Sequence, residues 1–322
     1  MTPQPGGSAA GPAGSRPDAA PHAPGAGPPP APGGTPPLYA ALLDDAALFP
    51  PGDAPMDAAV AAHLRYRAGP QSPMTGPFIV PAGRIPELGR ALARRPGAAL
   101  RVSVTVPDGP DGVGPALEAA RARPAIEAVA VEVAAHRGDD DAQTAANTAR
   151  AAAALEEHLP ARTAGFVELP RGTDPRRSLD ALSGTAQLAK LRTGGTRADA
   201  FPSEAELAAA LGAAARRGRA LKCTAGMHRA LRHTDTATGF EHHGFLNVLL
   251  AVHAALQGAD DAEAAAVLSM RDGARAAAAA AELSGDAASA VRALFTSFGT
   301  CSVLEPLEDL VALGRISPAV LE

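Results

Sequence analysis

Lysine is scarce in this chain, and its two lysines stand where they could act together. Lys190 lies in "AQLAKLRTGG" and Lys222 in "ALKCTAGMH", and all the other strongly basic side chains are arginine. A lysine amine that has lost its proton attacks carbonyl carbon and forms an imine, whereas a guanidinium stays protonated. Lysine at these two positions therefore indicates imine chemistry, the binding of an anion, or a structural role in which the lysines pair with inward carboxylates such as Glu168.

Each lysine is near the end of a predicted strand, and a glycine follows four residues later, Gly194 and Gly226 respectively. Side chains alternate between the two faces of a strand. Lys190 therefore shares a face with Arg192, and Lys222 shares one with Thr224. If both lysines point into one partly dry cavity, burial and mutual repulsion disfavour their charge, so we expect at least one lysine pKa to fall.

The spacing of apolar runs predicts the fold. Strands are expected at 44–49, 77–82, 100–106, 126–133, 164–170, 186–192, 220–224 and 294–300. Helices are expected near 56–67, 84–95, 114–122, 140–158, 174–183, 203–217, 245–285 and 305–313. Strands that alternate with helices in this way predict an α/β fold, a (β/α)8 barrel of the TIM type, with a doubly wound open sheet as the alternative. The long stretch 245–285 predicts a helical insertion between strands seven and eight.

In such a barrel the chemistry lies at the carboxyl ends of the strands, which is where both lysines fall. Residues 37–322 are expected to form this single domain. Residues 1–36 are rich in proline, glycine and alanine and predict a disordered tail.

Charge and hydropathy narrow the class of partner. The net charge of −5 argues against a nucleic-acid partner, and no apolar run is long enough to predict a membrane span. The first residues lack the pattern of a secretory signal, which favours a cytoplasmic location. A homo-oligomer is compatible with the sequence.

The last three strand ends, "KLRTGG", "KCTAGMH" and "SFGTCSVLEP", resemble those of the deoxyribose-phosphate aldolase group of class I aldolases. In that group a lysine on the sixth strand forms the imine, and a second lysine on the seventh strand lowers its pKa. The resemblance implies these two roles for Lys190 and Lys222. The family's glycine- and serine-rich strand ends cradle a phosphate, which implies an anion site lined by Gly226, Gly299, Thr300 and Ser302.

This sequence departs from the family's pattern at several positions. Arg192 stands where the family has a small hydroxyl residue, and the family's third-strand aspartate has Asp108 as its nearest counterpart. The insertion after the seventh strand has no equivalent in the family. The whole chain also resembles bacterial proteins of unassigned function.

Other polar residues are candidates for the site. His228 and Glu168 are candidate acids or bases, because both lie at strand ends and imidazole titrates near neutral pH. His242 and Asn247 flank the start of an apolar helical run and are candidate partners for a substrate. A rival interpretation joins Glu168, His228 and one of His242 and His243 in a metal site. No H-E-x-x-H pattern occurs, so we expect neither a bound metal nor a cofactor.

Acidic residues on other strands could balance the lysines. Asp44 and Asp45 lie near the first strand, where a solvated turn is an equal alternative. Glu132 lies in the fourth strand, where it points either into the barrel or toward a helix. Cys223 is expected to be a small buried residue. Cys301, in "GTCS", has no evident activating neighbour in the sequence.

These patterns together favour an enzyme that acts on a small anionic carbonyl compound, a phosphate or a carboxylate, with aldolase-like carbon–carbon bond chemistry through a lysine imine. A metal- or acid/base-dependent isomerase or hydrolase, and a non-catalytic barrel that binds an anionic ligand, stay open as alternatives.

Overall fold

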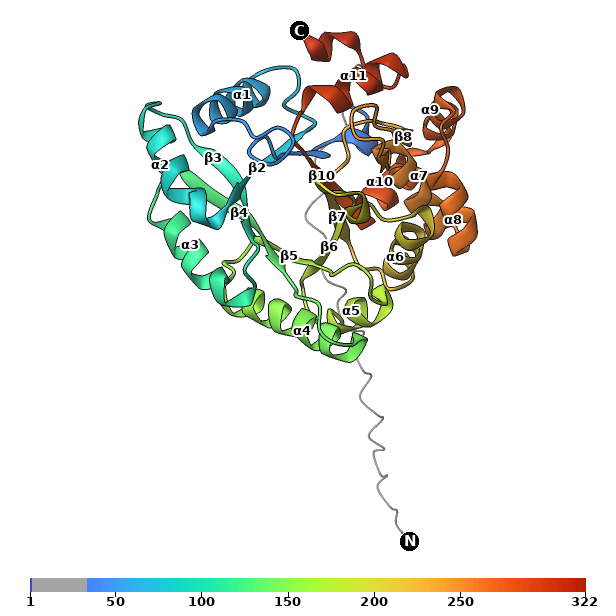
Figure 1. Cartoon of the computed structure of the whole chain (residues 1–322), viewed down its shortest axis with the longest axis horizontal. Helices are drawn as coiled ribbons and strands as arrows, with labels where there is room; N and C mark the ends of the chain where they lie inside the picture. Colours follow the sequence, from blue (N-terminus) through green and yellow to red (C-terminus); the bar gives the residue numbers. More distant parts are fainter. Residues whose placement is uncertain (2–33) are drawn as a thin grey trace.

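Eight parallel strands close into a barrel in the computed structural model, which describes Met1 and residues 34–322 (Figure 1). Their order around the barrel is β1, β10, β7, β6, β5, β4, β3, β2. The strands are β1 (Leu43–Asp45), β2 (Thr75–Pro81), β3 (Leu100–Val106), β4 (Ile126–Ala134), β5 (Ala164–Glu168), β6 (Leu188–Arg192), β7 (Leu221–Thr224) and β10 (Phe295–Thr300). The predicted TIM-type barrel is confirmed, and the open sheet is excluded because β1 pairs with both β2 and β10.

Helices surround the barrel. They are α1 (Met56–Ala68), α2 (Ile85–Ala93), α3 (Val113–Arg121), α4 (Asp141–His158), α5 (Pro175–Ala181), α6 (Glu204–Arg216) and α11 (Leu304–Ala312). Within the described residues no helix is long and apolar enough to cross a membrane. The predicted tail, 1–36, falls almost wholly outside the described residues.

The predicted insertion between the seventh and eighth barrel strands is confirmed. It comprises a two-stranded hairpin, β8 (His233–Thr234) and β9 (Glu241–His242), and then α7 (Phe245–Leu256), α8 (Asp261–Leu268), α9 (Gly273–Glu282) and α10 (Gly285–Leu294). These helices lie beside β10 and α6 on one side of the barrel in Figure 1.

The first strand is shorter than the predicted 44–49. It ends at Asp45 because the Asp45 carboxylate accepts a hydrogen bond from the Ala47 amide at 3.1 Å, which turns the chain. The other Asp45 oxygen lies 2.9 Å from the ring of His63 in α1. Asp45 therefore faces the helices, and Asp44, its neighbour, faces the barrel interior.

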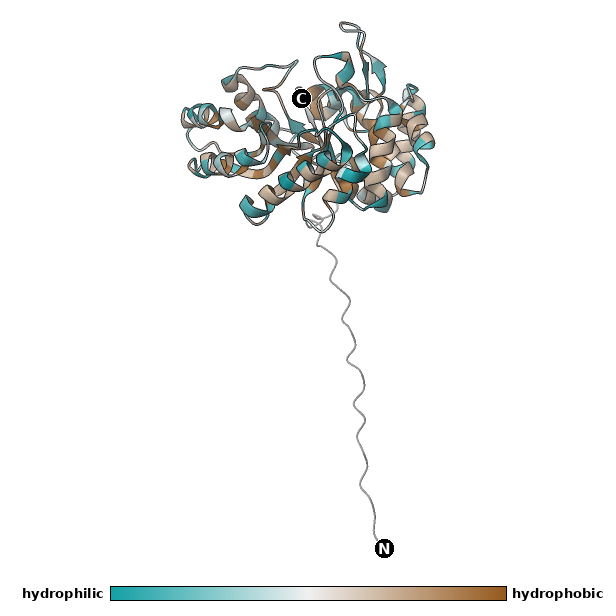
Figure 2. Cartoon of the chain, turned by 60° about the horizontal axis from the view of Figure 1, so that its bottom comes forward, coloured by the Kyte–Doolittle hydropathy of each residue, from teal (hydrophilic) through white to brown (hydrophobic). Residues whose placement is uncertain are grey.

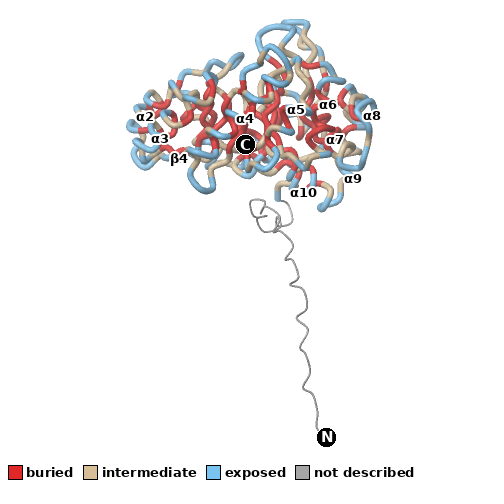
Figure 3. The backbone as a smooth tube through the Cα atoms, turned by 90° about the horizontal axis from the view of Figure 1, so that it is seen from below, coloured by how far each residue is buried: buried red, intermediate tan, exposed pale blue. Residues whose placement is uncertain are grey.

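Apolar side chains fill the space between the barrel and its helices. Phe298 of β10 stacks on Phe245 of α7 with ring centroids 5.1 Å apart, and both residues are fully buried. Burial of each such side chain stabilises the fold by about 1.5 to 3 kcal/mol. Figure 3 shows buried backbone through the middle of the molecule and exposed backbone at its edges, and Figure 2 shows hydrophilic residues on the outer helices.

Asn247 fastens the insertion to the loop that follows β7. Its side-chain oxygen accepts a hydrogen bond from the Arg232 amide at 2.8 Å, and its side-chain nitrogen donates to the carbonyls of Val267 and Met270, each at 2.9 Å. The side chain is fully buried. The predicted substrate-binding role of Asn247 is wrong, because backbone groups engage both ends of its amide.

We expect Asn247→Ala to lower the free energy of unfolding by about 2 to 4 kcal/mol, because it leaves buried backbone groups without partners. Chemical denaturation measures this value. The other asparagine of the chain provides the control. Asn147 is half-buried, donates to the His136 carbonyl at 2.9 Å and accepts from the Gln143 side chain at 3.2 Å. It does not hold three buried backbone groups, so Asn147→Ala should cost about 1 kcal/mol or less. Equal losses in the two variants would contradict the anchoring role.

Candidate active site at the barrel mouth

Six charged side chains of alternating sign form a continuous chain of ion pairs inside the barrel. We call them the charge chain, and in order of contact they are Asp44, Lys222, Glu132, Lys190, Glu168 and Arg192. They come from five strands, β1, β7, β4, β6 and β5. The charge chain holds three cations and three carboxylates, so its opposite charges balance within the interior.

Glu132 lies at the centre of the charge chain. One carboxylate oxygen is 2.7 Å from the Lys222 Nζ, and the other is 2.7 Å from the Lys190 Nζ. The two lysines are direct neighbours in the register of β6 and β7. The predicted juxtaposition of the lysines is therefore confirmed, with a carboxylate between their ammonium groups.

The ends of the charge chain differ. Lys222 pairs with Asp44 at the inner end, where the Ser297 hydroxyl also donates to Asp44 at 2.8 Å. At the outer end Lys190 lies 2.8 Å from Glu168, which pairs with the Arg192 Nε at 3.0 Å. Ser297 was not among the predicted site residues, although strand alternation places it on the inward face of β10.

Two more side chains support the centre. The Ser103 hydroxyl of β3 donates to Glu132 at 2.6 Å, so that carboxylate has three partners. The Lys222 Nζ lies 5.2 Å from the centre of the Phe166 ring, close enough for a cation–π contact. Neither Ser103 nor Phe166 was among the predicted site residues.

Exposure rises from the buried centre of the charge chain to its Arg192 end. The side chain of Lys222 is 1% exposed, that of Lys190 6%, and that of Arg192 44%. The charge chain therefore runs from the barrel interior toward solvent. A small molecule that enters from the Arg192 end reaches Lys190 before Lys222.

The expectation that a lysine pKa falls is wrong. Burial favours the neutral amine, but the attraction of two carboxylates outweighs burial at each lysine and raises the pKa of both Lys190 and Lys222. Glu132 separates the two ammonium groups, so their mutual repulsion does not decide the protonation state. Both lysines rest as ammonium ions.

The pKa values of the three carboxylates in the charge chain do not all shift in the same direction. Burial acts to raise the pKa of Glu132 and of Glu168, but the neighbouring cations outweigh it and lower both values. At Asp44 burial outweighs the attraction of Lys222 and raises the pKa. Asp44 is therefore the carboxylate of the chain that most readily takes a proton.

The two glycines that follow the lysines bring the ends of β6 and β7 into contact. A Cβ on Gly194 would lie 2.9 Å from the Cα of Gly226 and 2.7 Å from the Phe201 ring. Gly226 also has a φ of +74°, which side-chain-bearing residues adopt at a cost. The matched spacing of lysine and glycine thus reflects close packing of two loops.

The predicted anion-binding residues divide into two groups. Gly299 and Thr224 face each other, since a Cβ on Gly299 would lie 3.4 Å from the Thr224 hydroxyl. Thr300 instead donates its hydroxyl to the Ser302 carbonyl at 2.8 Å and is buried. The Ser302 hydroxyl accepts the Glu305 amide at 3.3 Å. Thr300 and Ser302 therefore shape the turn into α11, and the anion-binding role predicted for these two hydroxyls lacks support.

The histidines do not join the charge chain. His242 faces the Gly226 carbonyl at 3.1 Å and packs on Phe201, with ring centroids 4.4 Å apart. Burial lowers the pKa of His242. His228, predicted as a candidate acid or base, contacts Glu305 and Cys301 and lies outside the charge chain.

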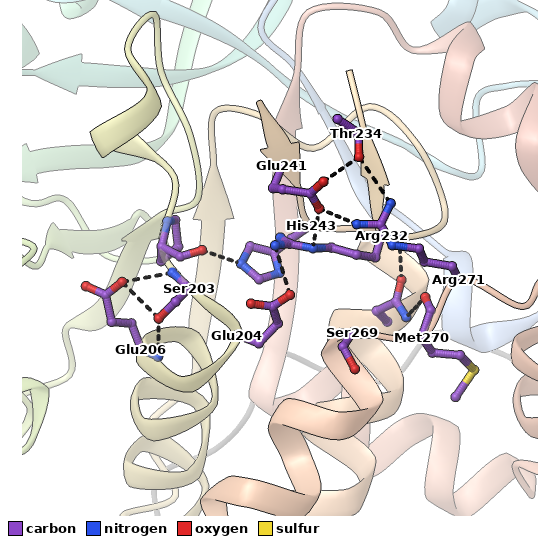
Figure 4. Close-up of polar contacts among 12 residues, drawn as sticks. Ser203, Glu204, Glu206, Arg232, Thr234, Glu241, His243, Ser269, Met270 and Arg271 are labelled. Atoms are coloured by element: carbon purple, nitrogen blue, oxygen red, sulfur yellow. Dashed lines mark hydrogen bonds and ion pairs between the residues drawn. The ribbon is translucent and has the colours of Figure 1, made fainter. Parts of the chain in front are cut away.

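His243 and Arg232 brace the insertion (Figure 4). The fully buried His243 ring lies 2.8 Å from the Pro202 carbonyl, and burial lowers the pKa of His243 to about 4. Arg232 pairs with Glu204 at 2.9 Å and with Glu241 at 3.2 Å, which ties the hairpin to the start of α6.

The ligand set of the rival metal interpretation is not assembled. Glu168 is paired with cations, and His228 and His243 face other partners. Across residues 1 and 34–322, no three histidine, cysteine, aspartate or glutamate side chains gather in an arrangement suited to a metal ion.

Comparison with known proteins does not assign this chain to a family. No protein-family model matches the chain, and no curated protein matches it.

Proposed function

We propose that the chain is an enzyme that forms an imine between Lys190 and a small anionic carbonyl compound, and that it makes or breaks a carbon–carbon bond beside the imine carbon. The observation that carries the proposal is the position of Lys190 between two carboxylates, one step in from the exposed Arg192. The likeness of the last three strand ends to class I aldolases agrees with this chemistry.

The first step is loss of a proton from the Lys190 ammonium group. Glu132 and Glu168 both lie within 2.8 Å of the Lys190 Nζ and are the available acceptors. The neutral amine then adds to the carbonyl carbon, and a carbon–nitrogen bond forms as the carbonyl π bond opens onto oxygen. Loss of water gives the imine. Once protonated, the imine accepts the electron pair of the bond between the α and β carbons and becomes an enamine, while the β-hydroxyl loses its proton and becomes a carbonyl group.

The rest of the charge chain supplies protons. Lys222 touches Glu132 and Asp44, so a proton that leaves Glu132 has a continuous path of ion-paired groups. Asp44 ends this path, and burial raises its pKa, so it accepts a proton more readily than Glu132 or Glu168. Glu168 lies between Lys190 and the exposed Arg192, where it can give a proton to the leaving hydroxide.

The anionic part of the substrate is assigned to the outer end of the chain. Arg192 is the most exposed member and uses its Nε on Glu168, which leaves its other nitrogens available to an anion. Thr224 lies opposite Arg192 in the register of β6 and β7, so its hydroxyl is a candidate donor to the same anion.

We expect borohydride to trap an adduct on Lys190. The intact protein would be incubated with small aldehydes and ketones that carry a phosphate or a carboxylate, reduced, and mapped by peptide mass. Lys190→Arg should abolish the adduct, because a guanidinium does not form an imine. Lys222→Met, the matched control, should keep the adduct on Lys190 at a lower rate. No adduct across the panel, or one that survives Lys190→Arg, would sink the proposal.

The pH dependence of trapping follows from the raised pKa of Lys190. Only the neutral amine reacts, so the trapping rate in the free enzyme should keep rising with pH above 8 and show no plateau near 7. Glu168→Gln removes one of the two carboxylates that stabilise the ammonium ion. This variant should move the rate curve to lower pH by about 1 to 2 units. An unmoved curve would contradict the role of Glu168. Glu87→Gln, on α2 and paired with Arg84, is the control.

A second function is favoured by the raised pKa of both lysines. Two lysines that rest as ammonium ions suit a barrel that binds an anion without catalysis. Calorimetry with inorganic phosphate tests this alternative. Binding that Arg192→Ala abolishes, in a protein that forms no adduct with any carbonyl compound, would favour a binding protein over an enzyme.

A further inference from the structure

A second cluster of reactive side chains lies at the same end of the barrel, outside the charge chain. Cys301 directly follows β10, His228 follows the neighbouring strand β7, and Glu305 lies in the first turn of α11. The Cys301 sulfur is 3.7 Å from each ring nitrogen of His228. The His228 Nδ1 is 3.0 Å from a Glu305 oxygen.

This arrangement matches that of an activated nucleophile. Such a site places a nucleophile beside a base, and a third group orients the base. Glu305 engages the His228 Nδ1, and the Cys301 sulfur lies equally far from Nδ1 and from Nε2. The ring and the sulfur are both partly exposed, so a small molecule can reach them.

We propose that Cys301, His228 and Glu305 form a second nucleophilic site, in which the Cys301 sulfur adds to the carbonyl carbon of a small aldehyde and His228 supplies the proton. This site does not depend on an imine at Lys190. The carbon–sulfur bond forms as the carbonyl π bond opens onto oxygen. That oxygen takes a proton from the His228 ring, and the product is a thiohemiacetal.

The charge of His228 suits this role. Burial acts to lower its pKa, but Cys301 and Glu305 outweigh burial and raise the pKa of His228 to about 9. The ring is therefore an imidazolium ion at neutral pH. A cation beside a cysteine favours the thiolate, which is the form that attacks.

The neighbouring loop restricts the size of the electrophile. A Cβ on Gly52, in the loop after β1, would lie 2.9 Å from the Cys301 Cβ. That loop therefore packs directly against the Cys301 side chain and leaves little space on that side of it. A small aldehyde fits this restriction better than a bulky one.

Alkylation of the full chain with iodoacetamide tests the site. In this probe reaction the thiolate displaces iodide, so a carbon–sulfur bond forms as the carbon–iodine bond breaks. Peptide masses separate Cys301 from Cys223, which is fully buried and serves as an internal control. Cys301 should react at pH 6.5, where an ordinary thiol of pKa about 8.5 is about 1% thiolate.

His228→Gln should slow the alkylation of Cys301 at pH 6.5 about tenfold or more and give it the pH profile of an ordinary thiol. His253→Gln, in α7 and away from Cys301, should leave the rate unchanged. Continued protection of Cys223 shows that each variant is folded. Equal rates in the native protein and in His228→Gln would overturn the proposal.

Acetaldehyde tests the carbonyl step. In Lys190→Arg, which has no amine at that position, acetaldehyde should still slow the alkylation of Cys301, and dilution should reverse the effect. The use of this variant separates the thiol site from the imine site. No protection by acetaldehyde would refute addition to a carbonyl, whatever the outcome of the trapping experiments on Lys190.

Discussion

The contact of one buried carboxylate with two buried ammonium groups governs the interior of this barrel. Glu132 has no exposed side-chain surface, and an unpaired charge at such a position is strongly unfavourable. Lys190 and Lys222 compensate it, and each of them in turn requires a further carboxylate. The strands that carry these residues must close in one register, because a slip of one residue would turn a charged side chain toward the apolar helix layer.

The same contact determines what chemistry is available. A lysine held between two carboxylates is charged at rest, so it becomes a nucleophile only when a proton moves to a neighbour. The alternating chain makes such movement local, since every member touches a group of opposite charge. Asp44 is the member whose pKa moves in the other direction from those of Glu132 and Glu168. Environments that separate the pKa values of nearby carboxylates are typical of acid and base pairs in enzymes.

Much of this architecture is readable from local pattern. Period-two alternation places Lys190 and Lys222 on the inward face, and the predicted strand 100–106 matches β3 at both ends. The direction of Glu132 was ambiguous, since valines flank it on both sides and an outward salt bridge was equally compatible. Its pairing with Lys222 depends on barrel closure, because β4 and β7 are not neighbours in the sheet and meet only across the interior.

Polar residues outside the strands were harder to assign. Asn247 was a candidate because it is polar at the start of an apolar helical run, and His243 because it was one possible metal ligand, but both side chains make packing contacts of the insertion. No periodicity marks which side chains of a long connection face inward. The partners of His228 are more than seventy positions away along the chain, so the sequence alone could not show that Cys301 has an activating neighbour.

The lysines and the thiol depend on the fold in different ways. The charge chain is built from strand residues and requires the closed barrel, because the removal of one member leaves its neighbours charged and buried. The cluster of Cys301, His228 and Glu305 is built from loops and the first turn of a helix, and it borders solvent. A change at Lys190 therefore alters the barrel interior and leaves the cluster of Cys301, His228 and Glu305 assembled.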